Sequence, residues 1–266
     1  MQNVSPLNEQ NAIQNVAFAI EFSEQVPSEV VQNFIAFHKK DAQLRSAFPR
    51  MQPLEMMSMQ VGSMGVTFPA SIKSIAGVTF DKLLPDGTQE VAILLRPDAL
   101  IFHCSKYESW ATVSTLAFKT LQNLASLCDK LKVSAIGLEY LDVFKVLSID
   151  KSGWLRELFN PESEYIPKHL IDSTGFWHCN QGFFSKAGDA QYELLNNFMI
   201  DCIPGDGTKL VQLRSQHKVQ SLINSQLRVL FDKNEAQRIF TCAHDITKDS
   251  LTKILSDSML KTLGVK

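Results

Sequence analysis

The 266-residue sequence lacks the marks of a secreted, membrane-spanning or disordered protein. Its amino terminus has no basic region followed by an apolar run, and no uninterrupted apolar stretch reaches the roughly 18 residues of a membrane helix. Glycine and proline are scarce, with 12 and 10 residues, which excludes fibrous and low-complexity classes. We therefore expect a cytoplasmic protein with a packed core.

Motifs of metal binding and thiol catalysis are missing as well. The cysteines are odd in number, and no two have the Cys-x-x-Cys spacing: Cys104, Cys128, Cys179, Cys202 and Cys242. Histidine and cysteine adjoin at residues 103–104 and 178–179, but neighbours in a strand point to opposite faces and cannot bind one metal together. We expect reduced, mostly buried thiols, no metal site and no cofactor.

The sequence also has no catalytic motif and no excess of positive charge. The motifs Gly-x-Ser-x-Gly and His-Glu-x-x-His and the P-loop do not occur. Lysine and arginine number 26 against 28 aspartate and glutamate residues, so nucleic acid is not the expected partner. An enzyme that uses His178, Cys179 or His244 stays an alternative, although we interpret Asp245 as the cap of the last helix.

The first half contains a clear order of strands and helices. Residues 13–22 alternate large apolar with small or polar side chains, which predicts a strand with one core face. A helix is expected from Pro27 to Leu44, and a long helix from Glu108 to Leu131. Between them, we expect an antiparallel meander of four strands near residues 55–66, 72–80, 89–96 and 99–105.

The second half repeats short pieces of the first half in the same order. Residues 18–22 read FAIEF and residues 136–140 read IGLEY, while residues 101–104 read IFHC and residues 239–242 read IFTC. These echoes predict a second β-α-β(4)-α unit, with an added hairpin near residues 217–232 and a last helix over about 246–263. The expected units are residues 1–132 and 133–266, as two domains or as one continuous domain.

Two such units favour an α+β fold with one curved antiparallel sheet and long helices on one of its faces. A sheet that holds a long helix in this way is the helix-grip arrangement. Two tandem units joined edge to edge would form a saddle like that of the TATA-box-binding protein. That likeness concerns the fold alone and assigns no function.

Four stretches resemble a sporadically distributed prokaryotic family of uncharacterised proteins of about 250 residues. They are VAFAIEF at residues 16–22, GVTFD at 77–81, LLRPDALIFHCSKYESW at 94–110 and IGLEYLDVF at 136–144. The resemblance implies an accessory-genome protein, such as a phage-defence or toxin-antitoxin component. In that family a basic residue often stands where this chain has Glu139.

Because catalytic motifs are missing, the expected function is a non-catalytic binding or interaction protein with a protein partner. Candidate binding residues are Glu139 and two methionines, Met57 and Met59, from a segment that holds five of the eight methionines. Methionine also fills cores, so packing explains that segment equally well. The alternatives are a small ligand between the sheet and the long helix, a nucleic-acid-binding saddle, and an enzyme of unknown type.

Overall fold

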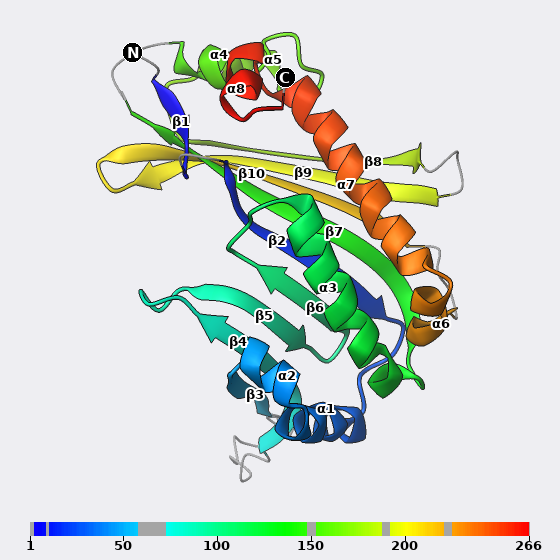
Figure 1. Ribbon diagram of the computed structural model, residues 1–266. Coiled ribbons are helices and arrows are strands. Elements are labelled where there is room, and N and C mark those ends of the chain that lie inside the picture. Colours follow the sequence, from blue (N-terminus) through cyan, green and yellow to red (C-terminus); the bar gives the residue numbers. More distant parts are fainter. Residues whose placement is uncertain are drawn as a thin grey trace, which may run out of the picture.

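An antiparallel sheet of eleven strands, with helices packed against it, forms the framework of the structure (Figure 1). The computed structural model describes residues 3–8, 11–57, 73–147, 153–187, 192–220 and 225–265. The expected α+β class with a large antiparallel sheet is therefore confirmed. Among the residues just given, no helix combines the length and the apolar character needed to cross a membrane.

The order of strands across the sheet is β3-β4-β5-β6-β2-β7-β10-β9-β8, so β2 and β7 are central. The short strands β1 and β11 pair with the two ends of β7. The bounds are β1 (Val4–Pro6), β2 (Ile13–Phe22), β3 (Arg50–Met57), β4 (Lys73–Leu83), β5 (Gln89–Leu95), β6 (Ala99–Cys104), β7 (Lys132–Val146), β8 (Trp177–Ala187), β9 (Tyr192–Gly205), β10 (Thr208–Val219) and β11 (Ser225–Gln226).

Helices cover one face of this sheet, and the long helices α3 and α7 lie across its strands (Figure 1). The short helices α4, α5 and α8 gather at the end of the sheet near β1 (Figure 1). The bounds are α1 (Ser28–Lys40), α2 (Ala42–Ala47), α3 (Trp110–Ala125), the 3-10 turn η1 (Ser126–Cys128), α4 (Trp154–Leu158), α5 (Lys168–Ile171), α6 (Leu227–Asp232), α7 (Glu235–Ile254) and α8 (Asp257–Thr262).

The first half follows the expected order of elements. Strand β2 covers residues 13–22, and β3, β4, β5 and β6 follow one another as a meander, although β3 begins earlier than expected, at Arg50. The helix expected over residues 27–44 is divided into α1 and α2 at Asp41. The Asp41 carboxylate accepts a hydrogen bond from the Leu44 N–H at 2.8 Å and caps α2, which explains the break.

The second half departs from the expected repeat. Three long strands (β8, β9 and β10) stand where four were predicted, and the hairpin predicted near residues 217–232 is the end of β10 followed by α6. Residues 239–242, expected as a strand, lie inside α7, because Ile239, Ala243 and Ile254 keep a helical spacing on its buried side. Asp245 is therefore in mid-helix and caps nothing.

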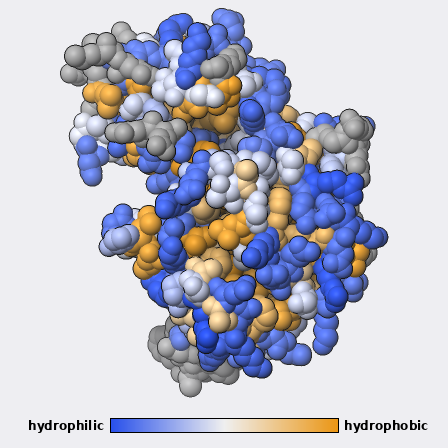
Figure 2. Space-filling model, in the orientation of Figure 1, coloured by the Kyte–Doolittle hydropathy of each residue, from blue (hydrophilic) through white to orange (hydrophobic). Residues whose placement is uncertain are grey.

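Two hydrophobic clusters fill the space between the sheet and its helices. The larger cluster centres on Phe18 of β2, whose ring contacts Trp110, Phe118 and Phe240 at centroid distances of 5.6, 6.0 and 5.2 Å. The smaller cluster joins β7, β9 and β10 to α4, α7 and α8. Figure 2 shows the helix-covered side, where hydrophilic residues surround smaller hydrophobic areas. The space beneath α3, where a small ligand was one alternative, is packed with core side chains.

Candidate binding trough on the helix-free face

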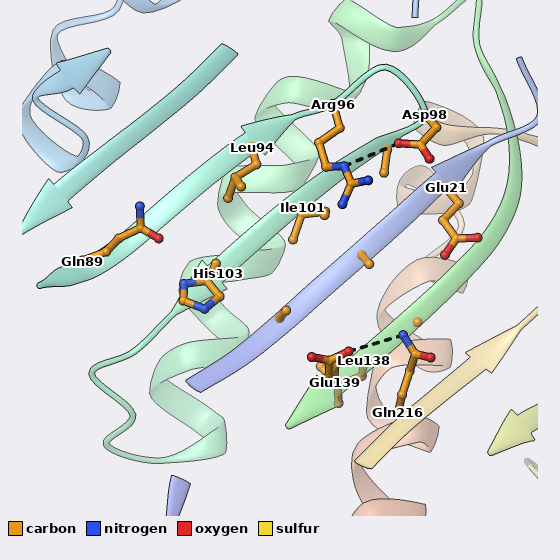
Figure 3. A pocket seen from close by; sticks show the side chains of 14 residues that line it. Glu21, Gln89, Leu94, Arg96, Asp98, Ile101, His103, Leu138, Glu139 and Gln216 are labelled. Carbon is orange, nitrogen blue, oxygen red and sulfur yellow. Dashed lines mark hydrogen bonds and ion pairs between the residues drawn. The ribbon is translucent and has the colours of Figure 1, made fainter. Parts of the chain in front are cut away.

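The face of the sheet away from α3 and α7 carries a hollow of about 460 Å³, here called the trough (Figure 3). Its floor is low because β2 alternates: the phenylalanine and isoleucine side chains enter the core, while Ala17 and Ala19 face the other way. Gly137 of β7 extends the floor, and a Cβ there would lie 3.3 Å from the His217 carbonyl oxygen. Small side chains on the central strands thus create the hollow.

Strand register brings polar residues from distant parts of the sequence into one row over this floor. Each member is the direct cross-strand neighbour of the next, from β4 through β5, β6, β2 and β7 to β10: Asp81, Ala92, His103, Ala17, Glu139 and Gln216. Since neighbouring strands lie about 4.8 Å apart, the Cα atoms of His103 and Glu139 are roughly 10 Å apart with Ala17 between them. A molecule resting on Ala17 can contact both side chains.

Glu139 is the half-buried carboxylate at this end of the trough. Its Oε1 lies 3.6 Å from the Arg214 Nε, and its Oε2 accepts a hydrogen bond from the Gln216 Nε2 at 3.4 Å (Figure 3). Burial raises the pKa of Glu139 above its ordinary value, and the Arg214 guanidinium opposes that rise. Both contacts are long for charge-assisted bonds, so Glu139 keeps capacity for a further donor.

His103 lies on the opposite side of Ala17. Its Nδ1 is shielded from solvent and has no hydrogen-bond partner among the described residues. Burial lowers the pKa of the imidazole, which favours the neutral ring with one donor and one acceptor. An unpartnered buried nitrogen is costly, so a ligand or water that bonds it would be stabilised.

The other end of the trough carries charges of both signs. The Lys218 Nζ bonds both carboxylate oxygens of Glu21, at 3.1 and 3.2 Å. The Arg96 Nε lies 3.6 Å from the Asp98 Oδ1 (Figure 3). Four residues of β2 separate this end from Ala17, so the two polar ends are roughly 13 Å apart along the strand. The trough is therefore a small-residue channel between two polar ends.

A support for one wall comes from a buried ion pair. Asp81 accepts two hydrogen bonds from Arg50, both at 2.6 Å, and a third at 3.0 Å from the Gln89 Nε2. The Arg50 hydrogen bond is the main reason that the pKa of Asp81 lies below its ordinary value. Gln89 is thereby held in place at the trough wall.

The sequence-predicted binding residues are only partly placed. Glu139 lies in the trough. Met57 ends β3, where it pairs with Lys73, but its side chain lies outside the described part of the structure. Met59 lies outside the described residues altogether.

The histidines and cysteines considered for catalysis do not form one site. His178 is exposed on β8 and its Nδ1 lies 2.5 Å from the Asp201 Oδ1 of β9, a pairing that the sequence gave no reason to expect. Cys179 points to the other face of the sheet, as strand geometry requires. His244 lies on α7, where its Nδ1 bonds the Tyr140 hydroxyl at 2.9 Å. Within the described ranges, no group of three metal-binding side chains could hold an ion.

A separate row of buried polar groups runs on the helix side of β7 and β10. Asp142 and Ser215 each have a side-chain oxygen without a hydrogen-bond partner in the described structure, and so does the Nε2 of His217. The His217 Nδ1 and the Asn196 Oδ1 are 2.7 Å apart. This row lies at the junction of the two hydrophobic clusters, which explains why the core is divided.

Most of the trough was missed at the level of sequence. The signal that could have found it is the run of small residues on the polar face of residues 13–22, where alanines stand between the core positions. The partners from β5 and β10 could not be found in this way, because register between distant strands has no local signal. No protein-family model matches this chain, and no curated protein sequence shows significant similarity to it.

Proposed function

We propose that this chain is a non-catalytic binding protein and that the trough holds a small polar ligand. The observation that supports this most is the hollow of about 460 Å³ with His103 and Glu139 facing one another across Ala17. Its volume lies within the range of roughly 300 to 1,000 Å³ that is typical of ligand pockets. A low apolar floor with a few convergent polar groups is the usual composition of such a site.

The charges of the lining favour a ligand with an amine or another hydrogen-bond donor. Among the lining residues, Glu21, Asp98 and Glu139 are acidic, and Arg96 is the basic partner of Asp98. Glu139 has the weakest internal contacts and accepts an ammonium or hydroxyl donor, while neutral His103 bonds a second polar atom. The same acidic lining disfavours a nucleic-acid phosphate backbone.

A test is to fill the trough without disturbing the fold. Ala19→Leu should occupy the floor and abolish binding of any amine-bearing compound that raises the melting temperature of the wild-type protein in a screen. Glu139→Gln should weaken the same compound about tenfold, since a charge-assisted bond becomes a neutral one. Glu193→Gln, a carboxylate exposed on β9, is the matched control and should bind as the wild type does.

Titration calorimetry on the purified variants gives the affinities. A screen in which no amine stabilises the protein, or a compound that binds Ala19→Leu as tightly as the wild type, would show that the trough is not the binding site.

The strand order supports an internal duplication, which we include in the proposal. The first strand of each half, β2 and β7, pair with one another at the centre, and the later strands of each half follow outward as β6-β5-β4-β3 and β10-β9-β8. An approximate twofold between β2 and β7 accounts for this order if the second half has one strand fewer. Membership in the sporadic prokaryotic family, an accessory-genome role and a cytoplasmic location remain proposals, which gene neighbourhood and fractionation can test.

A further inference from the structure

The two edges of the sheet differ in how well they are protected. At one edge, β3 contains Pro53, and its pairing with β4 is interrupted by a register shift between Leu54 and Glu55. Proline and bulges are common devices that stop another strand from adding to an edge. At the other edge, β8 pairs with β9 through eleven consecutive residues without a shift (Figure 1).

Strand β8 has none of these protections along most of its length. Its sequence, WHCNQGFFSKA, contains no proline, and its one lysine, Lys186, is next to the last position. Within the described residues β8 pairs with β9 alone, so the N–H and C=O groups of its outer edge are not used by another strand. Phe183 and Phe184 are 38% and 60% exposed on its two faces. Such an edge is a template for a further strand.

A side-chain pocket lies directly beside this edge. The pocket measures about 250 Å³ and is lined by Glu164, Tyr165, Gln181 and Phe183. The rings of Tyr165 and Phe183 are 6.0 Å apart, and Gln181 donates a hydrogen bond to the Tyr165 carbonyl oxygen. Added strands gain affinity from main-chain hydrogen bonds and specificity from pockets that take alternate side chains. The edge and the pocket together have both parts.

The charge around the pocket favours a basic side chain. Glu164 at the rim has no ion-pair partner among the described residues, whereas the nearby Lys253 is bound to Asp249 at 2.8 Å. A planar guanidinium stacks on aromatic rings while it bonds a carboxylate, which matches Tyr165, Phe183 and Glu164. We propose that β8 is the docking edge for an extended segment of a partner protein, which adds as a further strand and places an arginine in this pocket.

The proposal is tested with a fluorescein-labelled nine-residue peptide of alternating threonine and valine with one central arginine. The full-length protein should bind it in an anisotropy titration, and the same peptide with glutamate at the centre should bind at least tenfold more weakly. Phe183→Ala should weaken binding about tenfold, because one aromatic wall is lost, and Glu164→Gln about fivefold. Hydrogen exchange of the β8 amides should slow when the peptide is bound.

Matched controls separate this edge from general stickiness. Leu116→Ala removes a similarly exposed apolar side chain on α3, and Glu162→Gln changes an exposed carboxylate two residues from Glu164; both should bind as the wild type does. Equal affinity for the two peptides, no slowing of β8 exchange, or an unchanged affinity of Phe183→Ala would overturn the proposal. So would a dimer in sedimentation that Phe184→Lys dissociates, since the occupant of the edge would then be a second copy. These outcomes are independent of the trough.

Discussion

At the scale of single residues, Asp142 is the group whose environment conflicts most with its chemistry. It is 3% exposed, and its Oδ2 has no hydrogen-bond partner within the described residues. Burial raises the pKa of Asp142 to about 7, so the folded protein holds a proton that the unfolded chain releases near pH 4. Its neighbour in the same row, His217, is affected in the opposite sense, because burial lowers its pKa to about 4.

The pH dependence of Asp142→Asn should expose this conflict. A carboxyl with a raised pKa in the folded state contributes full stability below about pH 4, and that contribution is lost as the pH rises to about 7. The free energy of unfolding of Asp142→Asn relative to the wild type should therefore rise by up to roughly 4 kcal/mol between pH 4 and pH 8. Urea titrations across this range measure it. Asp206→Asn, in an exposed turn, should show no such trend, and a flat difference for Asp142→Asn would contradict the burial argument.

His217→Gln should change stability on the acid side. Since the folded state disfavours protonation of His217, its contribution is lost as the pH falls from about 6.5 to about 4. The variant should lose less stability than the wild type over this interval, by up to about 3 kcal/mol in the same urea titrations. Equal acid sensitivity of the two proteins would mean that His217 is solvated.

At the scale of elements, local periodicity predicted the first half and failed in the second half. Residues 13–22 alternate strictly, so both the strand and its core face were predictable. The segment 239–242 is a short apolar run, which fits a strand and a helix equally well, and only the wider spacing out to Ile254 identifies α7. In the same way Glu139 could be singled out, but its contacts with Arg214 and Gln216 depend on strand pairing between distant segments.

Gly77 shows how closely one element can depend on a missing side chain. A Cβ at this position in β4 would lie 2.2 Å from the carbonyl oxygen of Leu95 in β5. Gly77→Ala must therefore push the two strands apart and should destabilise the fold by roughly 1–3 kcal/mol or more. Gly182→Ala in β8, where the nearest atom is 3.8 Å away, is the matched control and should be neutral or slightly stabilising. Urea unfolding distinguishes the two, and similar midpoints would contradict the close contact.

At the scale of the whole molecule, the continuous sheet and the shared aromatic cluster tie the two halves together. Phe18 of β2 contacts Phe240 of α7, although they come from opposite halves of the chain. Phe240→Ala should cost roughly 3–5 kcal/mol. Hydrogen exchange followed separately in β4 and in β9 should show the same loss in both. A loss confined to β9 would mean that residues 1–132 and 133–266 unfold as independent domains.

The central pairing of β2 with β7 also has a consequence for biosynthesis. Strand β2 receives its neighbour β6 early, but its other neighbour begins at Lys132, 110 residues after β2 ends at Phe22. At roughly 5–20 residues per second, the ribosome needs on the order of 5–20 seconds to make that stretch. During this time the nascent chain presents β2 as an open edge with alternating phenylalanine and isoleucine. The stage of synthesis at which a chaperone would protect the chain most is therefore the one before β7 emerges from the exit tunnel.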